Sequence, residues 1–388
     1  MDIHLCLKKG KMEQTIFADN ASTSKLDLDA YEAMKPYLLD DFGNPSSGYL
    51  FARKPRKAID SARDTIARCI NAAPEEIFFT SGGTESINWA VKGIAVQNLH
   101  RGKHIITSSI EHDAVLNSCV FLKKIGFDVT FLPVNDKGLL LIEHLKNNIK
   151  KETILVSVMM ANNEIGTIQK IDELANLCKD RQAFFHCDAV QALGHIPVDV
   201  KELNVDLLSA SAHKFNGPKG VGFLYIKNGT ILSNLISGGK QENGYRAGTE
   251  NVAGIVGMSV ALKKNVDQIN SHKFYLQKLK DTFLEELKRG EIDFKLNGDI
   301  TNCLPGITNV SLKTVDGEAI MHRLDLIGIT ISTGSSCSSG SKKISHVIQA
   351  INTPPEYASG TLRISFSIDN SLNDAKIIAN AIVSIVRT

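Results

Sequence analysis

The 388-residue sequence lacks the features that would place it in several special classes of protein. It has no apolar run long enough to cross a bilayer, and its first residues lack the apolar core of a secretory signal. Lys and Arg number 44 against 42 Asp and Glu, so the formal net charge is only +2. Because no charge of one sign dominates, we expect neither direct nucleic-acid binding nor membrane binding.

Cysteine is sparse, and no two cysteines form a CxxC pair. The seven are scattered along the chain, at Cys6, Cys69, Cys119, Cys178, Cys187, Cys303 and Cys337. Their odd number and spacing argue against a disulfide framework and a zinc site, so we expect no metal and a reducing, cytoplasmic location. Six of them have apolar or helical surroundings, which predicts small core residues. Cys337 has different surroundings.

Short β-branched runs alternate with helical stretches in the first two thirds of the chain. Apolar strands separated by amphipathic helices predict βαβ units and a largely parallel sheet that is covered on both faces. The expected helices include 55–70, 85–98, 114–125 and 171–179. The expected strands are Ile77–Thr80, His104–Ser108, Asp128–Pro133, Thr153–Val158, Ala183–Cys187, Val205–Ser209 and Gly222–Ile226.

The last third of the chain predicts a second unit. A long helical stretch, 251–289, has few breakers and leads into a region that mixes strands with helices. We expect a short N-terminal extension at 1–14, a large unit at 15–264 and a small unit at 265–388, with 15–30 open to either unit. A Ser- and Gly-rich run within 332–345 predicts a mobile loop of the small unit.

Polar residues follow the strands of the predicted sheet. In open α/β sheets, ligands bind beyond the carboxyl ends of the strands, so these residues are expected to meet at one edge. The segments concerned are 81–85, 110–114, 162–166, 188–191 and 211–214.

The stretch from Ser209 to Gly220 contains the most unusual of these residues, Lys214. It follows a short run that indicates a buried strand, and it lies between a histidine and an aromatic residue just before a Gly-Pro turn. Burial would lower the pKa of this lysine and make its amine a nucleophile or a proton carrier. The alternative is an ordinary loop lysine at the surface.

Gly82-Gly83-Thr84 lies between a strand and a helix and has the outline of a phosphate cradle. Glycine lets backbone N–H groups approach an anion, and the helix N-terminus favours negative charge. The alternative is a tight turn. The segment is neither a P-loop nor a GxGxxG fingerprint, which disfavours nicotinamide and flavin cofactors.

Two further residues have both a structural and a functional interpretation. Asp188 follows a strand and is either a helix N-cap or an anion directed at the cation of a ligand. His112 is either an ordinary core or loop histidine or a ring that stacks on a ligand. Together with Lys214 and the phosphate cradle, they are the components of a pyridoxal 5'-phosphate site.

These residues stand in segments that resemble the cysteine desulfurase family of class V aminotransferase-type enzymes. The resemblance spans nearly the whole chain in the family's order. The matching segments are 18–23, 43–47, 80–86, 111–112, 162–166, 186–191, 209–222, 246–249, 332–339 and 360–365. Ser22 and Ser24 are mild departures, standing where the family usually has Ala and Thr.

The resemblance implies an α/β protein with fold type I of the PLP-dependent transferases. This fold has a large domain with a mostly parallel seven-stranded sheet and a smaller α+β domain. Lys214 would form the Schiff base and shuttle protons, Asp188 would pair with the pyridinium nitrogen, and Gln191 would bond the phenolic oxygen. His112 would stack on the ring and assist proton transfer.

The resemblance also implies which residues hold the phosphate and the substrate. The phosphate would be held by the Gly83 backbone with Thr84, Ser211 and His213, and by Thr249 of the partner subunit in a homodimer. Asn163 and Arg363 would bind the carboxylate of L-cysteine, since the planar fork of Arg matches a carboxylate.

Cys337 lies in the Ser/Gly-rich loop, which resembles that of the subgroup with a long mobile catalytic loop. As a thiolate it would take sulfur from the substrate as a persulfide, leaving alanine, and the loop would then carry the sulfur to an acceptor protein. The alternative for Cys337 is an incidental exposed thiol.

Three alternatives stay open for the function. They are a selenocysteine lyase, a cysteine sulfinate desulfinase and a non-catalytic scaffold on the same fold. The sequence stops at Thr388, soon after its last predicted helix, where many housekeeping members run further. This leaves the sulfur acceptor open between iron–sulfur cluster assembly and the thiolation of tRNA or DNA.

Overall fold

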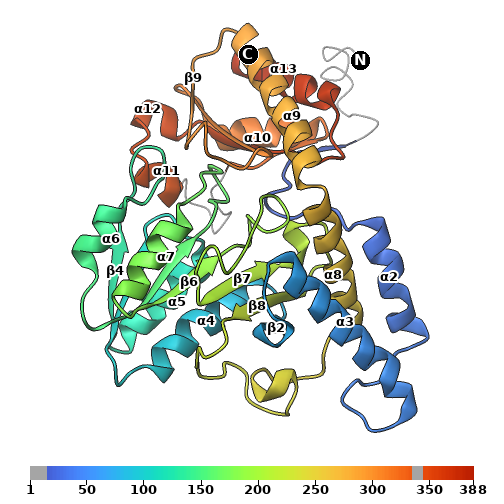
Figure 1. Ribbon diagram of the computed structural model, residues 1–388. Helices are drawn as coiled ribbons and strands as arrows, with labels where there is room; N and C mark the ends of the chain where they lie inside the picture. Colours follow the sequence, from blue (N-terminus) through green and yellow to red (C-terminus); the bar gives the residue numbers. More distant parts are fainter. Residues whose placement is uncertain (1–14, 334–343) are drawn as a thin grey trace.

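A seven-stranded sheet forms the centre of the computed structural model, which describes residues 15–333 and 344–388 (Figure 1). The strand order is β2-β8-β7-β6-β5-β3-β4, and β8 runs antiparallel to both neighbours while the other pairs are parallel. The strands are β2 (Ile77–Thr80), β3 (His104–Ser108), β4 (Asp128–Leu132), β5 (Thr153–Met159), β6 (Phe184–Asp188), β7 (Leu207–Ser211) and β8 (Gly222–Ile226). The predicted α/β class with a mostly parallel seven-stranded sheet is therefore confirmed.

The inner strands of this sheet are buried on both faces and are rich in apolar residues, whereas the edge strand β4 is partly exposed. Alternate residues point to opposite faces, so Phe78 packs in the core formed with α4 (Gly83–Gln97) and α5 (Asp113–Lys124). Its neighbour Phe79 packs on the other side with α3 (Arg53–Cys69), α7 (Ile171–Asp180) and α8 (Val252–Asp267).

The start of β7 differs from the sequence prediction, which began this strand at Val205. The carboxylate of Asp206 accepts a hydrogen bond from the backbone N–H of Phe185 at 2.8 Å, and the ladder begins only at Leu207. The backbone N–H of Asp206 also bonds the Phe185 carbonyl at 3.1 Å, so both the side chain and the backbone of Asp206 hold Phe185 just before the ladder begins.

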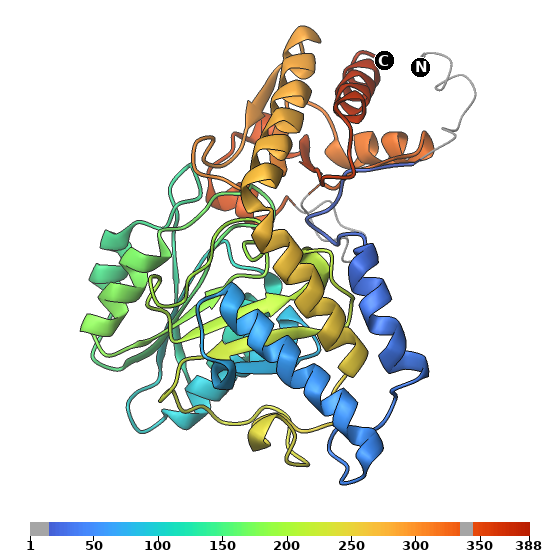
Figure 2. The same cartoon turned by 45° about the vertical axis from the view of Figure 1, so that its right-hand side comes forward.

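The predicted helical stretch 251–289 is two helices rather than one. α8 ends at Asp267 and α9 (Ile269–Arg289) begins two residues later, with Gln268 between them. The backbone of Gln268 leaves the helical region (φ −112°, ψ 7°), and its N–H caps α8. Figure 2 shows α8 lying along the large sheet, whereas α9 rises to the second core.

The second core, here called the small unit, contains β1, β9 to β12, α9, α10 and α13. Its three-stranded antiparallel sheet has β10 (Ile307–Leu312) between β9 (Phe294–Leu296) and β12 (Thr361–Ser365). α10 (Gly317–Leu326) and α13 (Leu372–Val386) pack with α9 against it. β1 (Ile16–Phe17) pairs in parallel with β11 (Ile329–Thr330), so the first described strand lies in this unit and the chain then crosses to the large sheet.

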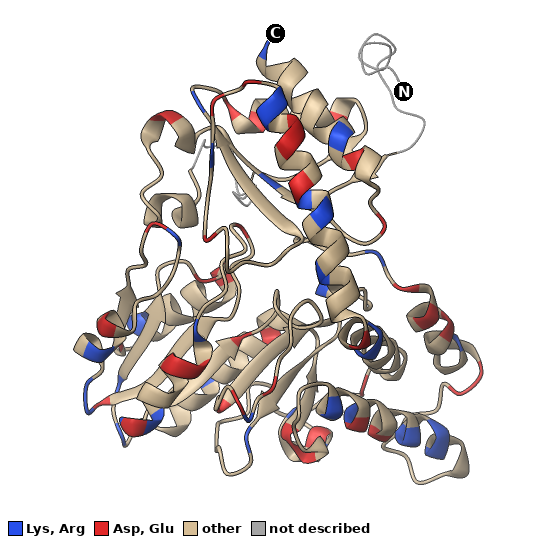
Figure 3. Cartoon of the chain, turned by 45° about the horizontal axis from the view of Figure 1, so that its top comes forward, with Lys and Arg blue, Asp and Glu red and all other residues tan. Residues whose placement is uncertain are grey.

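The remaining described helices lie at the periphery. They are α2 (Leu28–Leu39), α6 (Ile142–Asn148), α11 (His346–Ala350) and α12 (Pro355–Ala358). Lys and Arg are interspersed with Asp and Glu on outer helices such as α3 and α9 (Figure 3). Over the described residues, every helix is too short or too polar to traverse a membrane.

The cysteines within the described residues are all free thiols. Cys119, Cys178 and Cys187 are buried, as expected of core residues, and Cys69 and Cys303 are partly buried. Burial raises the pKa of the Cys69 thiol to about 11 and that of Cys119 to about 12, so these thiols stay protonated.

Candidate active site

The carboxyl ends of the parallel strands bring most of the predicted site residues to one edge of the large sheet. Asp188 is the last residue of β6 and Ser211 is the last residue of β7. Arg363 reaches the same region from β12 of the small unit, where it interacts electrostatically with Lys214. The site therefore lies between the two sheets.

Lys214 ends a short 3-10 turn, Ala212–Lys214, that follows β7 directly. Its Nζ donates hydrogen bonds to the carbonyl oxygens of Ala21 at 2.7 Å and Ser22 at 2.8 Å. Burial, reinforced by the charge of Arg363, lowers the pKa of Lys214 to about 8, while Asp19 and Asp188 oppose the shift. Lys214 is partly buried, and its pKa shifts in the direction expected for a lysine withdrawn from water.

Asp188 is buried, and its Oδ1 accepts a hydrogen bond from the N–H of Val190 at 3.0 Å. Burial raises the pKa of this carboxyl group, opposed by that N–H and by His112 and Lys214. A cation placed against Asp188 would compensate the cost of burying its charge. Gln191, also buried, donates from Nε2 to the Ala21 carbonyl at 2.7 Å.

His112 is the N-cap of α5, so the structural interpretation of this residue holds at least in part. Its Nδ1 accepts a hydrogen bond from the N–H of Ala114 at 3.1 Å. The ring is exposed, and with Nδ1 occupied only its Nε2 and its face are available to a ligand.

The N-terminus of α4 forms an open cradle for an anion. Its N-cap, Gly82, has φ +146° and no side chain to bond the first N–H groups of the helix. A Cβ on Gly83 would lie 2.7 Å from Val190 Cγ2, so only glycine fits between α4 and the 188–191 turn. The hydroxyl-bearing residues Thr84 and Ser211 lie at this cradle, the former exposed on α4 and the latter close to Gly83.

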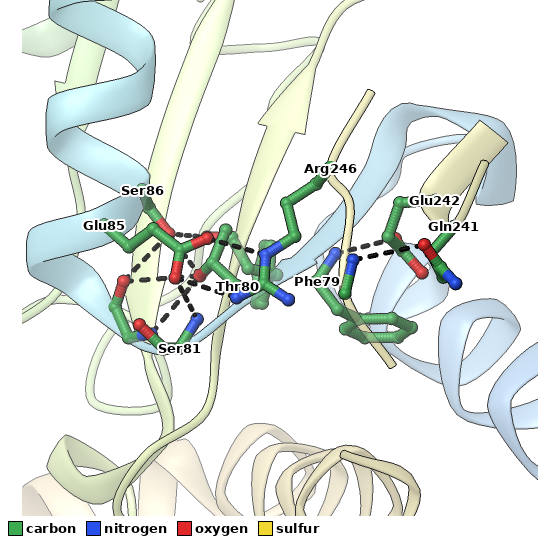
Figure 4. A network of polar contacts seen from close by, with 11 residues as sticks. Phe79, Thr80, Ser81, Glu85, Ser86, Gln241, Glu242 and Arg246 are labelled. Carbon is green, nitrogen blue, oxygen red and sulfur yellow. Dashed lines mark hydrogen bonds and ion pairs between the residues drawn. The ribbon is translucent and has the colours of Figure 1, made fainter. Parts of the chain in front are cut away.

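Two carboxylates tie this cradle to the segment 241–249 (Figure 4). Glu85 accepts hydrogen bonds from Arg246 Nε at 2.8 Å and from the Ser81 N–H at 2.9 Å. Arg246 stands three residues before Thr249, which is exposed. The ion pair between Arg246 and Glu85 thus anchors the segment that leads to Thr249 at the cradle.

Glu242 forms the second link and is almost fully buried. Its Oε1 accepts from Arg63 NH2 at 2.7 Å, and its Oε2 accepts from the N–H of Phe79 in β2 at 2.8 Å. The exposed fraction of the side chain is 3% for Glu242 and 15% for Arg63, so this ion pair is shielded from water.

Arg363 is buried and held by three oxygen atoms. NH2 donates to Asp19 Oδ1 and to Ser22 Oγ, both at 2.7 Å, and NH1 donates to the carbonyl of Asn163 at 3.0 Å. Its Nε is buried without a hydrogen-bond partner within the described residues. An oxyanion of a ligand could satisfy that donor.

Both ends of the segment that contains Cys337 are fixed at this site, although Cys337 itself lies outside the described residues. The backbones of Ser332 and Arg363 exchange hydrogen bonds at 2.6 and 3.1 Å. On the other side, Ser345 donates to Glu164 Oε2 at 2.6 Å, next to Asn163.

His213 precedes Lys214 and faces the loop that follows β1. Its Nδ1 lies 3.2 Å from Thr23 Oγ1. Burial and the neighbouring Lys214 and Lys219 lower the pKa of His213 to about 4, so the ring is neutral. A neutral imidazole can still donate one hydrogen bond to an anion.

Several residues of the site escaped the sequence analysis. Asp19, Ser22, Glu85 and Arg246 lie in segments that carry the family resemblance, but only their contacts assign them a task. Glu111 adjoins His112 and is fully buried, with Oε1 bonded by Ser108 at 2.6 Å and Oε2 unpartnered among the described residues. No pattern in the sequence predicts its burial.

The arrangement suits a ligand with an anionic group at the α4 cradle, a cationic atom at Asp188 and a carbonyl carbon within reach of Lys214. No group of three or more His, Cys, Asp or Glu side chains able to hold a metal ion occurs in residues 15–333 and 344–388. The cradle, the buried carboxylate and the amine suit an organic cofactor with a phosphate and a basic ring.

Comparison with known proteins agrees with this chemistry. The family model described as aminotransferase class-V matches residues 16–378. A curated cysteine desulfurase, IscS of Dictyoglomus turgidum, is 51% identical over 363 residues, 94% of this chain and 92% of that protein. A solved NifS-like protein has 34% identity and a TM-score of 0.91, covering 96% of this chain and 100% of that chain. SspA in complex with cysteine has 36% identity and a TM-score of 0.81, over 91% and 99% of the chains.

The buried pair Arg63–Glu242 predicts a large stability difference. Arg63→Met would leave the Glu242 carboxylate buried without its cation, and we expect a loss of about 3–5 kcal/mol in urea unfolding. Lys35→Met is the matched control, because its partner Glu32 is 54% exposed, and there we expect less than about 1 kcal/mol. Equal losses in the two variants would contradict the assignment.

Glu111 predicts a pH-dependent stability. Burial raises its pKa from 4.5 to about 8, so between these values the folded state holds a proton that the unfolded state has lost. Stability should therefore fall by about 1.4 kcal/mol per pH unit as pH rises through this window, and level off above it.

Urea unfolding of the apo-protein across that window measures this effect. Glu111→Gln cannot ionise and should remove this component of the slope, whereas Glu143→Gln at an exposed position should retain it. Parallel profiles for the wild-type protein and Glu111→Gln would refute the assignment.

Proposed function

This chain belongs to the class-V aminotransferases and, within them, to the cysteine desulfurases, and on that premise we propose how its residues divide the reaction. The protein converts L-cysteine to L-alanine and passes the sulfur, as a persulfide on Cys337, to an acceptor protein. The observation that supports this most directly is the Lys214 amine, whose lowered pKa and charged neighbours Asp188 and Arg363 suit an amine that must lose and regain a proton.

The residues present fit pyridoxal 5'-phosphate. The uncapped α4 N-terminus with Gly83, Thr84, Ser211 and His213 would hold the phosphate, joined by Thr249 of the partner subunit. The buried carboxylate of Asp188 would hold the pyridinium nitrogen.

The cofactor's ring has two further neighbours in this proposal. Gln191 would bond its phenolic oxygen, and His112 would lie on its face. When bound, the cofactor supplies an electron sink that weakens the bonds at the α-carbon of the substrate.

The protein's own side chains would bind the substrate and move its proton. Arg363, oriented by Asp19 and Ser22, would bind the substrate carboxylate together with Asn163, using the Nε that lacks a partner. Lys214 Nζ would take the proton from the α-carbon, because an amine with a pKa of about 8 is partly unprotonated at neutral pH.

Cys337 would then remove the sulfur. Its thiolate attacks the sulfur atom of the substrate, and a sulfur–sulfur bond forms as the bond between sulfur and the β-carbon breaks. The electron pair of that bond stays with the carbon, which takes up a proton, so that alanine leaves and Cys337 keeps a persulfide. Ser332 and Ser345 support this role, since both flanks of the Cys337 segment are bonded at the site.

We further propose a cytoplasmic homodimer. α2 and the segment after it expose large apolar side chains, including Leu39 at 73%, Phe42 at 69% and Leu50 at 71%. Such a cluster is typical of a protein interface. Of the acceptors, a protein of iron–sulfur cluster assembly or of a thiolation pathway would fit the persulfide chemistry.

Two substitutions test the division of labour between lysine and cysteine. Lys214→Ala should lose the visible absorbance of bound cofactor and the adduct that borohydride fixes to the protein. Cys337→Ser should keep that absorbance but lose more than about a hundredfold of alanine formation from cysteine. Cys69→Ser, in α3, serves as the cysteine control and should retain activity.

Full activity of Cys337→Ser would overturn the persulfide route. Turnover of selenocysteine or cysteine sulfinate by that variant would then favour a selenocysteine lyase or a desulfinase. Absence of cofactor binding by the unaltered protein would favour a non-catalytic scaffold.

The homodimer is tested by light scattering. We expect about twice the 42.3 kDa mass of the chain. Phe42→Glu should lower that mass toward the single chain, because a carboxylate would be buried at the interface. Leu326→Glu, at an exposed position on α10, is the matched control and should leave the mass unchanged.

A further inference from the structure

The turn that carries Lys214 cannot satisfy its own backbone. Within it, the N–H groups of Phe215 and Gly217 both bond the carbonyl of Ala212, which leaves the next three carbonyls without a partner from the turn. These are the carbonyls of His213, Lys214 and Phe215. Buried carbonyl groups are costly when unpaired, so other segments must supply donors.

Each of the three carbonyls is bonded by a different segment. Ser24 bonds the His213 carbonyl through its N–H at 2.8 Å and its hydroxyl at 2.9 Å. Asn265 of α8 donates from Nδ2 to the Phe215 carbonyl at 3.0 Å. The ring of His195 contacts the Lys214 carbonyl itself, with Nε2 at 2.9 Å.

The acceptor fixes the tautomer of His195. A carbonyl oxygen can only accept, so Nε2 must carry the proton. Burial lowers the pKa of His195, the bond to the Lys214 carbonyl opposes this, and the charges of His272 and Lys214 reinforce it. The ring is therefore a neutral donor at physiological pH.

His195 connects two loops that both contribute to the site. His195 follows the turn that runs from Asp188, at the end of β6, to Gln191. Its ring bonds the turn after β7 that carries Lys214. Gly194 allows the approach: its φ is +81°, and a Cβ there would lie 2.8 Å from the Cβ of Phe215.

We propose that His195 is a positioning residue for Lys214, which holds the lysine backbone in register with the Asp188–Gln191 turn. This role rests on the proposed function, because that function is the reason why Lys214 must be aligned with the Asp188–Gln191 turn. With the backbone fixed, the Lys214 side chain extends from a defined point to the Ala21 and Ser22 carbonyls. Among the described residues, His195 is the only hydrogen-bond donor to the Lys214 carbonyl, the central one of the three. Without this bond, that carbonyl would have no partner there.

The consequence for the amine follows from its surroundings. The charged groups that face Lys214 are Arg363, Asp19 and Asp188, and burial is the largest cause of its lowered pKa. A loosened turn would let water reach the amine, so its pKa would rise toward the ordinary lysine value.

Three variants test the proposal. His195→Leu removes the donor, and His195→Gln retains an N–H near the position of Nε2. His272→Leu is the control, since His272 is a partly buried neighbour of His195 that makes no bond to the Lys214 turn in the described residues.

Reductive methylation of the apo-protein, followed by mass spectrometry of the Lys214 peptide, reports the pH midpoint of labelling at that amine. Thermal unfolding is recorded beside it. We expect an upward shift of the midpoint in His195→Leu, a return toward the wild-type midpoint in His195→Gln, and no shift in His272→Leu. With cofactor and L-cysteine, kcat of His195→Leu should fall about ten- to a hundredfold with little change in KM.

An unchanged labelling midpoint in a folded His195→Leu protein overturns the proposal, as does an equal shift in His195→Gln. If His195→Leu fails to fold, the comparison of His195→Gln with the wild-type protein decides, because retained labelling and kcat then support the donor role and their loss refutes it. The labelling result needs no turnover. A shifted labelling midpoint would therefore support the role of His195 even if the protein did not desulfurate cysteine. A lack of desulfuration would contradict the proposed function alone.

Discussion

The carbonyl oxygen of Ala21 is the contact on which the rest of the site depends. It accepts hydrogen bonds from Lys214 Nζ and from Gln191 Nε2, and it belongs to the strip of chain that leaves β1. That strip begins in the small unit, paired with β11, and reaches the large sheet within a few residues. One backbone atom thus holds together the lysine, the Asp188–Gln191 turn and the first segment of the small unit.

Arg363 also connects the two units, in this case from the small unit. It belongs to β12 of the small unit, and its guanidinium bonds Asp19 and Ser22 in the strip that leaves β1 as well as the carbonyl of Asn163 in the large unit. Charged groups of both signs are therefore buried where the units meet, an arrangement that costs stability unless each is paired. The Nε of Arg363, which has no partner among the described residues, and the raised pKa of Asp188 mark two places where pairing is incomplete. At these two places a substrate carboxylate and a cofactor cation would add the missing partners and so contribute most to stability.

The sequence predicted well where the strands of the large sheet lie along the chain and which polar residues follow them, because alternation of apolar runs with helices is a local signal and the edge rule is topological. For Lys214 it left a buried amine and a surface loop lysine open. It failed at the start of β7 and in the middle of 251–289, where Asp206 and Gln268 act through contacts that no periodicity reports. Arg246 and His195 were missed as site residues because each contacts a segment that is not adjacent along the chain, and Glu111 was missed because its burial depends on the packing around it.

The link between Glu85 and Arg246 has a thermodynamic consequence for the proposed homodimer. Arg246 binds Glu85 in the first turn of α4, where the phosphate would sit, and three residues on, the exposed Thr249 would contact the partner subunit in the proposed homodimer. A bound phosphate would order the cradle, and docking of the partner subunit would involve the same segment of chain. Each event would therefore make the free energy of the other more favourable. Cofactor loading and subunit association would be reciprocal: a subunit that has lost its phosphate releases its partner more easily, and a dissociated subunit binds phosphate less tightly.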